Sequence, residues 1–418
     1  MKQTDKYFKN FIYAIIFSPI IGYFSYNYIK LSGFGMFGQQ LLCYLAIPIF
    51  IIWLFQKREY IIFPKYLYFF LLYIIYIYIW DLFNGNYDQK GFIKYIFNNY
   101  NVYIFLFLII FYNVKISNDT FKRIIYLLKF VLVAALGGSI IQTFIPDFFV
   151  NMSQWSKGNL FTDSIYTSRR PSIFTWVSDN DYGITVPAYL SLLIAYLKLK
   201  VDNKQILFFV LIIILYAVLS NTRYVMLGTL LVISQLFIFS NLKGTSKNLV
   251  ILFISSIIFY QMITIVFEYD FISLFSERLF AEKQVTNSSR YYSYELFLRF
   301  FGDKPIFGTG IWLTTEQEYA ANAGGSSQIH IGYLAHLISY GLVGSFLLFS
   351  FWFALARDLF KKARKSRYFG GFFGFLVYLA GQLTYVDYIL IIPGILLSII
   401  LSEYYYQNYL NNSSFNHA

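Results

Sequence analysis

Long apolar runs, separated by short polar connections, follow one another along most of the chain. Each of about twelve runs has roughly the 20 residues that a helix needs to cross about 30 Å of hydrocarbon. They lie near 11–29, 35–55, 61–80, 92–112, 122–145, 183–199, 205–219, 224–240, 248–267, 329–355, 370–386 and 388–406. The runs do not alternate as barrel strands do. The pattern therefore predicts an all-α polytopic membrane protein, a single integral membrane domain over 1–418 with about 12 transmembrane helices.

Positive charge is spread unevenly over the polar connections. Lysines and arginines gather in alternate connections, for example at 57–58, 115–123, 198–204, 243–247 and 357–367. The short connections that alternate with them hold few lysines or arginines, chiefly Lys30, Lys90 and Arg223. Because lysine and arginine favour the cytoplasmic side of a membrane, we expect both termini to be cytoplasmic. The cluster at 357–367 is expected to anchor the protein at anionic lipid headgroups.

Composition narrows the class of protein further. With 58% hydrophobic and 13% charged residues, the chain is too apolar for a soluble protein of this size. The net charge of +12 flanks the apolar runs, which indicates membrane lipids rather than nucleic acid as the anionic partner. The one cysteine, Cys43, lies inside an apolar run, so neither a disulfide framework nor a thiolate metal site is expected. No metal-ligand motif or nucleotide-type phosphate loop is present in the sequence, and no cofactor is expected.

Two long polar stretches interrupt the apolar runs, at 146–182 and 268–328. The charge rule places both as extracytoplasmic loops, whereas the cytoplasmic connections are short. Long loops that a rigid scaffold positions often carry function. Chemistry is therefore expected on the outer face of the membrane.

Several arginines on this outer side are candidates for binding a phosphorylated substrate, because their planar, permanently charged fork suits phosphate. Arg170 precedes Pro171, which favours an extended backbone, and Arg223 lies in a short external turn that disfavours arginine without an anionic partner. Arg290 begins a helix-like stretch whose free N–H groups also favour an anion, and Arg299 follows in the same loop. The alternative interpretation is that these are interfacial anchors or ordinary loop arginines.

A histidine at the outer end of the run 329–355 is the candidate proton-transfer group, because histidine titrates near neutral pH. The spacing predicts one helical face shared by His330, Leu334, Leu337, Gly341 and Gly344. The glycines would allow close helix contact, while the same face presents the histidine at the water boundary. A buried structural histidine is the alternative for His330 and the expected role of His336, which lies on another side.

These residues form short motifs that resemble those of the Wzy-like O-antigen polymerase and O-antigen ligase superfamily. Residues 330–344 are similar to its His-Asn-x-x-Leu-x-x-Leu-x-x-x-Gly-x-x-Gly motif. Arg290, followed by Pro-Ile-Phe-Gly-Thr-Gly at 305–310, resembles its Arg…Pro-x-x-Gly-x-Gly segment. The turn 220–223 resembles Ser-x-Ser-Arg, and the stretch 170–180 resembles Arg-x-x-Gly-x-Phe…Pro-Asn.

The chain departs from these motifs at a few positions. Ile331 replaces the usual asparagine after the histidine, and Thr222 replaces the second serine of the turn. Ser172-Ile173 replaces a glycine step, and Ser178-Asp179-Asn180 stands in for the Pro-Asn pair. The order of the motifs and their external placement match the superfamily but do not separate polymerase from ligase.

The resemblance implies glycosyl transfer from an undecaprenyl-diphosphate-linked saccharide, without nucleotide sugar or metal, at the outer face of the bacterial cytoplasmic membrane. It implies that Arg170, Arg223, Arg290 and Arg299 surround the diphosphate, and that His330 assists the acceptor hydroxyl as general base or by orienting it. A flippase and a chain-length regulator are the protein partners that the family suggests.

Three functions are compatible with these observations. The first is a polysaccharide polymerase that joins lipid-linked repeat units into a capsule, exopolysaccharide or O-antigen. The second is a ligase that moves the finished glycan to a lipid or protein acceptor. The third is a saccharide flippase or other transporter, for which polar residues along a path at mid-membrane are expected; here the charges gather in the external loops instead.

Overall fold

The computed structural model describes residues 8–17, 47–55, 61–84, 100–144, 185–220, 223–238, 297–298, 301–302, 304–310, 331–383 and 392–415. Regular structure in these residues is helical, as the apolar runs predict. The main helices are α3 (Lys65–Phe83), α5 (Tyr100–Asn113), α6 (Asn118–Phe144), α9 (Thr185–Leu199), α10 (Asn203–Ser220), α11 (Arg223–Ile238), α17 (Gly332–Ser366), α18 (Gly370–Gly381) and α19 (Ile392–Phe415). Shorter helical segments lie at Phe8–Phe17 and 47–55.

The observed helices fall on the predicted apolar runs. α10 covers the run predicted at 205–219, and α11 covers most of the run at 224–240. In the described part of the chain, α3, α17 and most of α6 are long and apolar enough to cross a membrane, and shorter apolar helices accompany them. The run 248–267 lies outside the described residues, and 11–29 and 35–55 are described only in part. The number of about twelve spans therefore stays a prediction.

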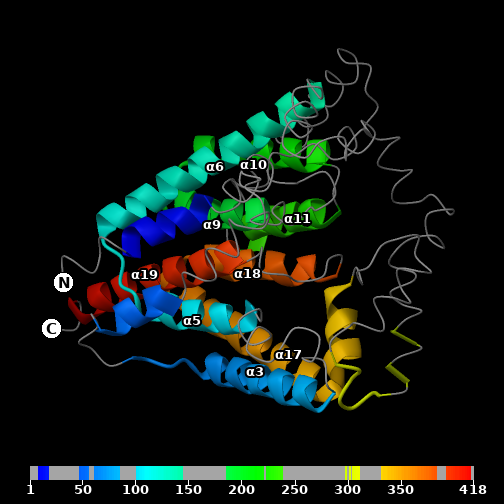
Figure 1. Cartoon of the computed structure of the whole chain (residues 1–418). Helices are drawn as coiled ribbons and strands as arrows, with labels where there is room; N and C mark the ends of the chain where they lie inside the picture. The colour runs from blue at the N-terminus through cyan, green and yellow to red at the C-terminus, as the bar shows by residue number, and fades with distance from the viewer. Residues whose placement is uncertain are drawn as a thin grey trace, which may run out of the picture.

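The helices run lengthwise between two ends of one bundle (Figure 1). The connection between α5 and α6 and the C-terminal end of α19 lie at the left-hand end in Figure 1. The C-terminal end of α3 and the junction between α10 and α11 lie at the right-hand end. This separation agrees with the predicted alternation of the connections, although the side that faces the cytoplasm rests on the charge rule alone.

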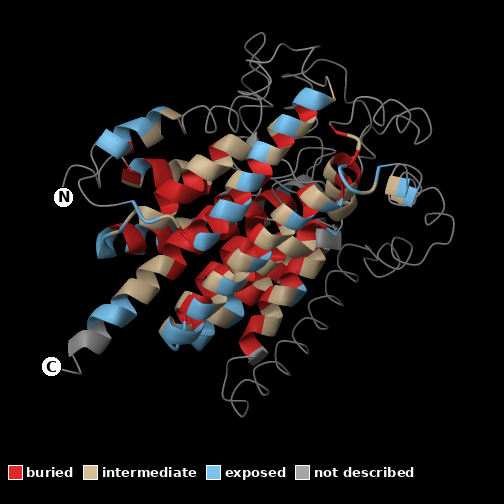
Figure 2. Ribbon diagram, turned by 90° about the horizontal axis from the view of Figure 1, so that it is seen from below, coloured by how far each residue is buried: buried red, intermediate tan, exposed pale blue. Residues whose placement is uncertain are grey.

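α9 lies at the centre of the bundle, in contact with α6, α10, α11, α18 and α19. Nearly all of its residues are buried, and buried residues line the facing sides of the helices (Figure 2). The Ser191 hydroxyl lies 3.1 Å from Oε1 of Gln235 and 2.9 Å from the carbonyl oxygen of Gly370, and the Tyr368 hydroxyl donates to the carbonyl oxygen of Leu192. These polar contacts join α9 to α11 and to the start of α18, and they give the buried hydroxyls of Ser191 and Tyr368 their partners.

Small residues allow α18 to lie close against α19. A Cβ atom at Gly371 would come within 2.0 Å of Ser402 Oγ and 2.4 Å of the Ser398 carbonyl oxygen. A Cβ atom at Gly374 would come within 2.6 Å of Ser398 Oγ. Glycine at these positions brings two helix backbones together, which is a common way to pack helices in membranes.

We expect Gly371→Ala to destabilise the protein by about 1–3 kcal/mol, because the new methyl group must push α18 away from α19. The apparent Tm of the purified protein in detergent measures the effect. Gly137→Ala is the matched control, since nothing lies within 4 Å of a Cβ atom at that position of α6. Equal Tm values for the two variants would show that the α18–α19 contact is not tight.

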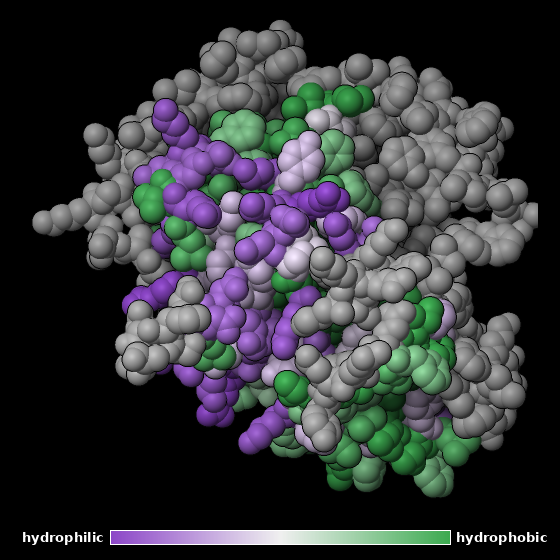
Figure 3. Space-filling model, turned by 90° about the vertical axis from the view of Figure 1, so that its left-hand side faces the viewer, coloured by the Kyte–Doolittle hydropathy of each residue, from purple (hydrophilic) through white to green (hydrophobic). Residues whose placement is uncertain are grey.

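The outward sides of the helices are rich in large apolar side chains. On α3 they include Tyr68, Leu72, Ile75 and Ile79, and on α17 they include Phe346 and Phe353, which is 71% exposed. In water such an apolar surface would promote aggregation, whereas in contact with lipid it is stable without a protein partner. The left-hand end of the bundle is different, because hydrophilic residues gather there (Figure 3).

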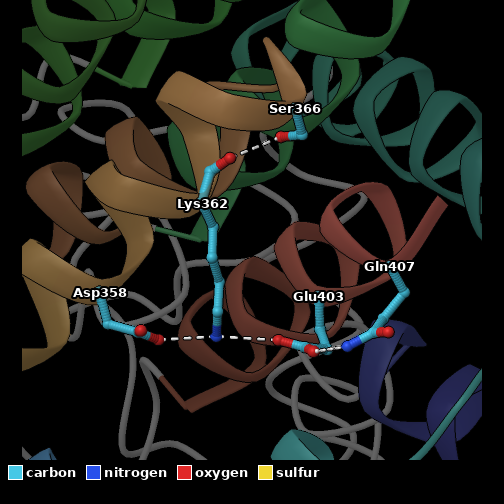
Figure 4. Close-up of polar contacts among 5 residues, drawn as sticks. All are labelled: Asp358, Lys362, Ser366, Glu403 and Gln407. Carbon is cyan, nitrogen blue, oxygen red and sulfur yellow. Dashed lines mark hydrogen bonds and ion pairs between the residues drawn. The ribbon is translucent and has the colours of Figure 1, made fainter. Parts of the chain in front are cut away.

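Lys362, near the C-terminal end of α17, corrects one part of the sequence interpretation. It belongs to the cluster 357–367 that was predicted to touch lipid headgroups, yet its side chain is only 7% exposed. Its Nζ atom lies 2.7 Å from an oxygen of Asp358 and 2.8 Å from an oxygen of Glu403 on α19 (Figure 4). It also lies over the ring of Tyr112 on α5, 4.5 Å from the centroid. Lys362 therefore joins three helices, while Lys361 beside it is exposed.

Candidate functional site

α17 is broken at Gly341, close to its N-terminal end. Gly341 has φ 60° and ψ −163°, a conformation that is essentially restricted to glycine. The short part before the break, 332–340, crosses the right-hand end of the bundle, and the long part after it runs back along α3 (Figure 1). The predicted continuous face from His330 to Gly344 is therefore wrong, because the helix changes direction between Leu337 and Gly344.

The break exposes backbone amides that begin the long part of α17, and a turn from the preceding loop binds them. The N–H of Leu342 donates to the carbonyl oxygen of Pro305 (2.9 Å), and the N–H of Val343 donates to that of Ile306 (3.0 Å). The first N–H groups of any helix lack partners within the helix. Here the partners come from 304–310, the glycine-containing turn singled out in the sequence.

The same turn also binds the carbonyl groups at the end of the short part. The N–H of Thr309 donates to the carbonyl oxygen of Ile338 (2.9 Å), and the N–H of Gly310 donates to that of Ser339 (2.8 Å). The Thr309 hydroxyl lies 3.2 Å from the Ile338 oxygen as well. The turn therefore forms hydrogen bonds with free backbone groups on both sides of the break. These bonds explain how a break inside an apolar helix is stable.

Two glycines make this close approach possible. A Cβ atom at Gly341 would lie 2.4 Å from the carbonyl oxygen of Ile306, and one at Gly308 would lie 2.5 Å from that of Ser339. Both residues have positive φ, and the atoms they would strike belong to the backbone. Neither position can accept a side chain without moving the turn away from the helix.

Tyr76 of α3 spans the turn and the broken helix. Its hydroxyl lies 2.9 Å from the carbonyl oxygen of Phe307 and 3.0 Å from that of Tyr340. Its ring lies against Gly344, where a Cβ atom would come within 2.7 Å. Trp80, one turn further along α3, stacks on the ring of Phe307 with 5.1 Å between centroids. The turn, the break and the C-terminal part of α3 thus form one packed junction.

His336 lies on the short part of α17 and is held by aromatic neighbours. Its Nδ1 atom is 3.3 Å from the hydroxyl of Tyr73, and its ring packs edge-on against Trp352. Its Nε2 atom is buried and has no partner among the described residues. These contacts are those of the structural histidine that the sequence suggested.

Asp81 near the end of α3 is a further buried polar group that the sequence analysis did not select. It is completely buried and lies near Tyr76 and Tyr78. One signal was available, because an acidic residue inside an apolar run is expensive and often functional. Within the described residues, no group of three or more His, Cys, Asp or Glu side chains forms a cluster suited to a metal ion.

A comparison with known protein families finds a match for part of the chain. Residues 208–349 match a family model described as O-antigen ligase, a segment that includes most of α10, all of α11, the turn 304–310 and the break at Gly341. This match places residues 208–349 in the Wzy/O-antigen ligase superfamily. The resemblance predicted from the motifs is thereby confirmed. No curated protein matches the chain.

The match and the apolar helices together indicate a helical membrane protein with a polysaccharide-related function. The structure gives the family's Pro-x-x-Gly-x-Gly segment a physical role, because this segment is the turn that binds the break in α17. Of the two glycines assigned to helix contacts, Gly344 lies against Tyr76 of α3 as expected, whereas Gly341 lies against the turn 304–310.

The predicted site residues themselves remain predictions. Arg170, Arg290, Arg299 and His330 lie outside the described residues, and of Arg223 only the backbone is described, as the first residue of α11. The start of α11 and the junction both lie at the right-hand end of the bundle in Figure 1. His330 precedes the short part of α17 by two residues, and Arg299 precedes Pro305 by six.

Proposed function

We propose that this protein is a polysaccharide polymerase that joins undecaprenyl-diphosphate-linked oligosaccharide repeat units at the outer face of the cytoplasmic membrane. The observation that carries the proposal is the match of 208–349 to a family model described as O-antigen ligase. The junction supports it, because an ordered turn connects the loop that holds the candidate arginines to the helix that follows the candidate histidine.

In the proposed reaction, a hydroxyl oxygen of the acceptor saccharide bonds to the anomeric carbon of the donor, and the bond from that carbon to the lipid diphosphate breaks. The leaving diphosphate gains negative charge, which Arg170, Arg223, Arg290 and Arg299 stabilise without a metal ion. His330 takes the proton of the hydroxyl or orients it by a hydrogen bond. Cleavage of the donor's glycosyl–phosphate bond drives the transfer, so no nucleotide sugar is needed.

The second candidate is a ligase, which the description of the matching family favours. It would use the same donor chemistry but transfer a finished glycan to a lipid or protein acceptor. The two functions differ in what accumulates on the lipid carrier when the protein is absent. A polymerase leaves single repeat units on the carrier, whereas a ligase leaves full-length chains.

A strain that lacks the gene, complemented with the wild type or with single variants at matched protein levels, tests this proposal. His330→Ala and Arg290→Ala are each expected to reduce long-chain glycan at least about a hundredfold, because each removes a group that acts on the reacting atoms. The length ladder of the glycan, on the carrier and on the cell surface, is the measurement.

Arg123→Ala is the matched control, because this exposed arginine lies in the first turns of α6, at the opposite end of the bundle. Normal ladders from both site variants would exclude the proposed site. Full-length glycan on the carrier in the deletion strain would identify a ligase, and a carrier intermediate trapped on the cytoplasmic side would identify a flippase.

A further inference from the structure

The junction of α3, the turn 304–310 and the broken helix α17 has a feature that the reaction chemistry does not explain. One hydroxyl, that of Tyr76, faces the carbonyl oxygens of Phe307 and Tyr340, which come from opposite sides of the junction. Phe307 belongs to the turn, and Tyr340 is the last residue before the break. A hydroxyl proton can serve either oxygen, so the bond adds a link from α3 to the backbone hydrogen bonds that already join the two segments.

The two segments that Tyr76 joins are those that lead to the proposed reacting groups. The turn follows the loop with Arg290 and Arg299, and the short part of α17 follows His330. Transfer requires the diphosphate and the acceptor hydroxyl to be held in one geometry, and a misplacement of about 1 Å can be costly. A contact that fixes one segment against the other therefore acts on the reaction without touching the substrate.

We propose that Tyr76 is a positioning residue for glycosyl transfer: its hydroxyl keeps the turn 304–310 and the short part of α17 in register, that is, in one fixed relative position. This inference rests on the proposed function. The ring has a separate task, because it fills the space over Gly344 and lies along Trp80, with 6.5 Å between the ring centroids. Loss of the hydroxyl alone should therefore leave the ring packed against Gly344 and Trp80. It should weaken only the link that holds the turn and the short part of α17 in their relative position.

Tyr76→Phe is the test, with Tyr68→Phe as matched control. Tyr68 lies on the same helix but is 55% exposed on the outward side. The purified proteins would be compared in lipid nanodiscs, with the lipid-linked oligosaccharide extracted from the deletion strain as donor and acceptor. We expect the kcat of Tyr76→Phe to fall about tenfold, as loss of one well-placed hydrogen bond allows, with KM within about twofold of the wild type.

Hydrogen exchange gives an independent readout of the register. The N–H groups that join the turn to α17 should exchange faster in Tyr76→Phe than in the wild type or Tyr68→Phe; they belong to Thr309, Gly310, Leu342 and Val343. Faster exchange together with a lower kcat supports the inference. An unchanged kcat per folded molecule would overturn it, even with a lower yield or Tm, because the role would then be structural only.

The failure of the inference can be distinguished from that of the proposed function. If the wild type transfers saccharide, Arg290→Ala does not, and Tyr76→Phe turns over like the wild type, only the inference fails. If the purified wild type forms no glycosidic bond with this donor, the proposed function fails and the inference falls with it.

Discussion

Gly341→Ala is expected to separate the turn from α17 and to destabilise the protein by on the order of 4 kcal/mol. Two costs combine in this variant. The backbone conformation at φ 60° and ψ −163° is strained for any residue with a Cβ atom. The new methyl group would also lie 2.4 Å from the carbonyl oxygen of Ile306, which is backbone and cannot rotate away.

The measurement for this prediction combines the apparent Tm of the purified protein with the glycan ladder in cells. Gly308→Ala should behave in the same way, because it strikes the other side of the same contact. Gly302→Ala is the control in the same loop, since a Cβ atom there meets nothing within 4 Å. A Gly341→Ala protein with the Tm and ladder of Gly302→Ala would show that the turn does not dock at the break.

Lys362→Met is expected to destabilise the protein by about 3–5 kcal/mol, because it leaves the carboxylates of Asp358 and Glu403 without their cation. Glu403 is the more affected, since its side chain is only 12% exposed, whereas that of Asp358 is 31% exposed. Gln407 still donates to Glu403 (2.7 Å), but a neutral amide does not offset the charge.

A double variant separates the loss of the pair from the cost of the uncompensated charge. Lys362→Met with Glu403→Gln should recover part of the stability that Lys362→Met loses, because the buried charge is gone. Thermal unfolding of the variants in detergent measures both effects. Lys361→Met, beside it but exposed, should unfold like the wild type. If Lys362→Met does so too, the ion pairs contribute nothing to stability.

The positions of the helices were largely predictable, because a helix that crosses a membrane requires a long uninterrupted run of apolar residues. The run 205–219 became α10, Asn203–Ser220, within two residues at each end. The break in α17 was not predictable in this way. The apolar pattern continues through Gly341, and only a partner from elsewhere in the chain can supply the hydrogen bonds that the break requires.

The burial of Lys362 was also beyond the sequence pattern. It stands among exposed cations in the last turns of α17, and its partner Glu403 follows 41 residues later on another helix. Nothing local distinguishes it from Lys361. The same holds for Tyr76, one of 40 tyrosines in the chain, whose position at the junction depends on the approach of two distant segments.

The candidate arginines and histidine could be selected from the sequence for a different reason. Arginine and histidine in the predicted external loops stand out against an apolar chain, and their motifs resemble those of the superfamily that the family model matches over 208–349. The roles of Arg290 and His330 remain predictions that their variants will test. The surrounding framework could not be inferred from the motifs, because glycine in a motif does not reveal which backbone it approaches.

α17 is held near both of its ends, by the turn at Gly341 and by the ion pairs at Lys362. The two points are 21 residues apart, which corresponds to about 32 Å of helix. Over that length a tilt of about 5° moves the far end by roughly 3 Å, several times the misplacement that catalysis tolerates. The ion pairs at Lys362 therefore influence the position of the other end of the helix, near Gly341. Substitutions at the end remote from the proposed reaction can therefore impair it without any contact with substrate.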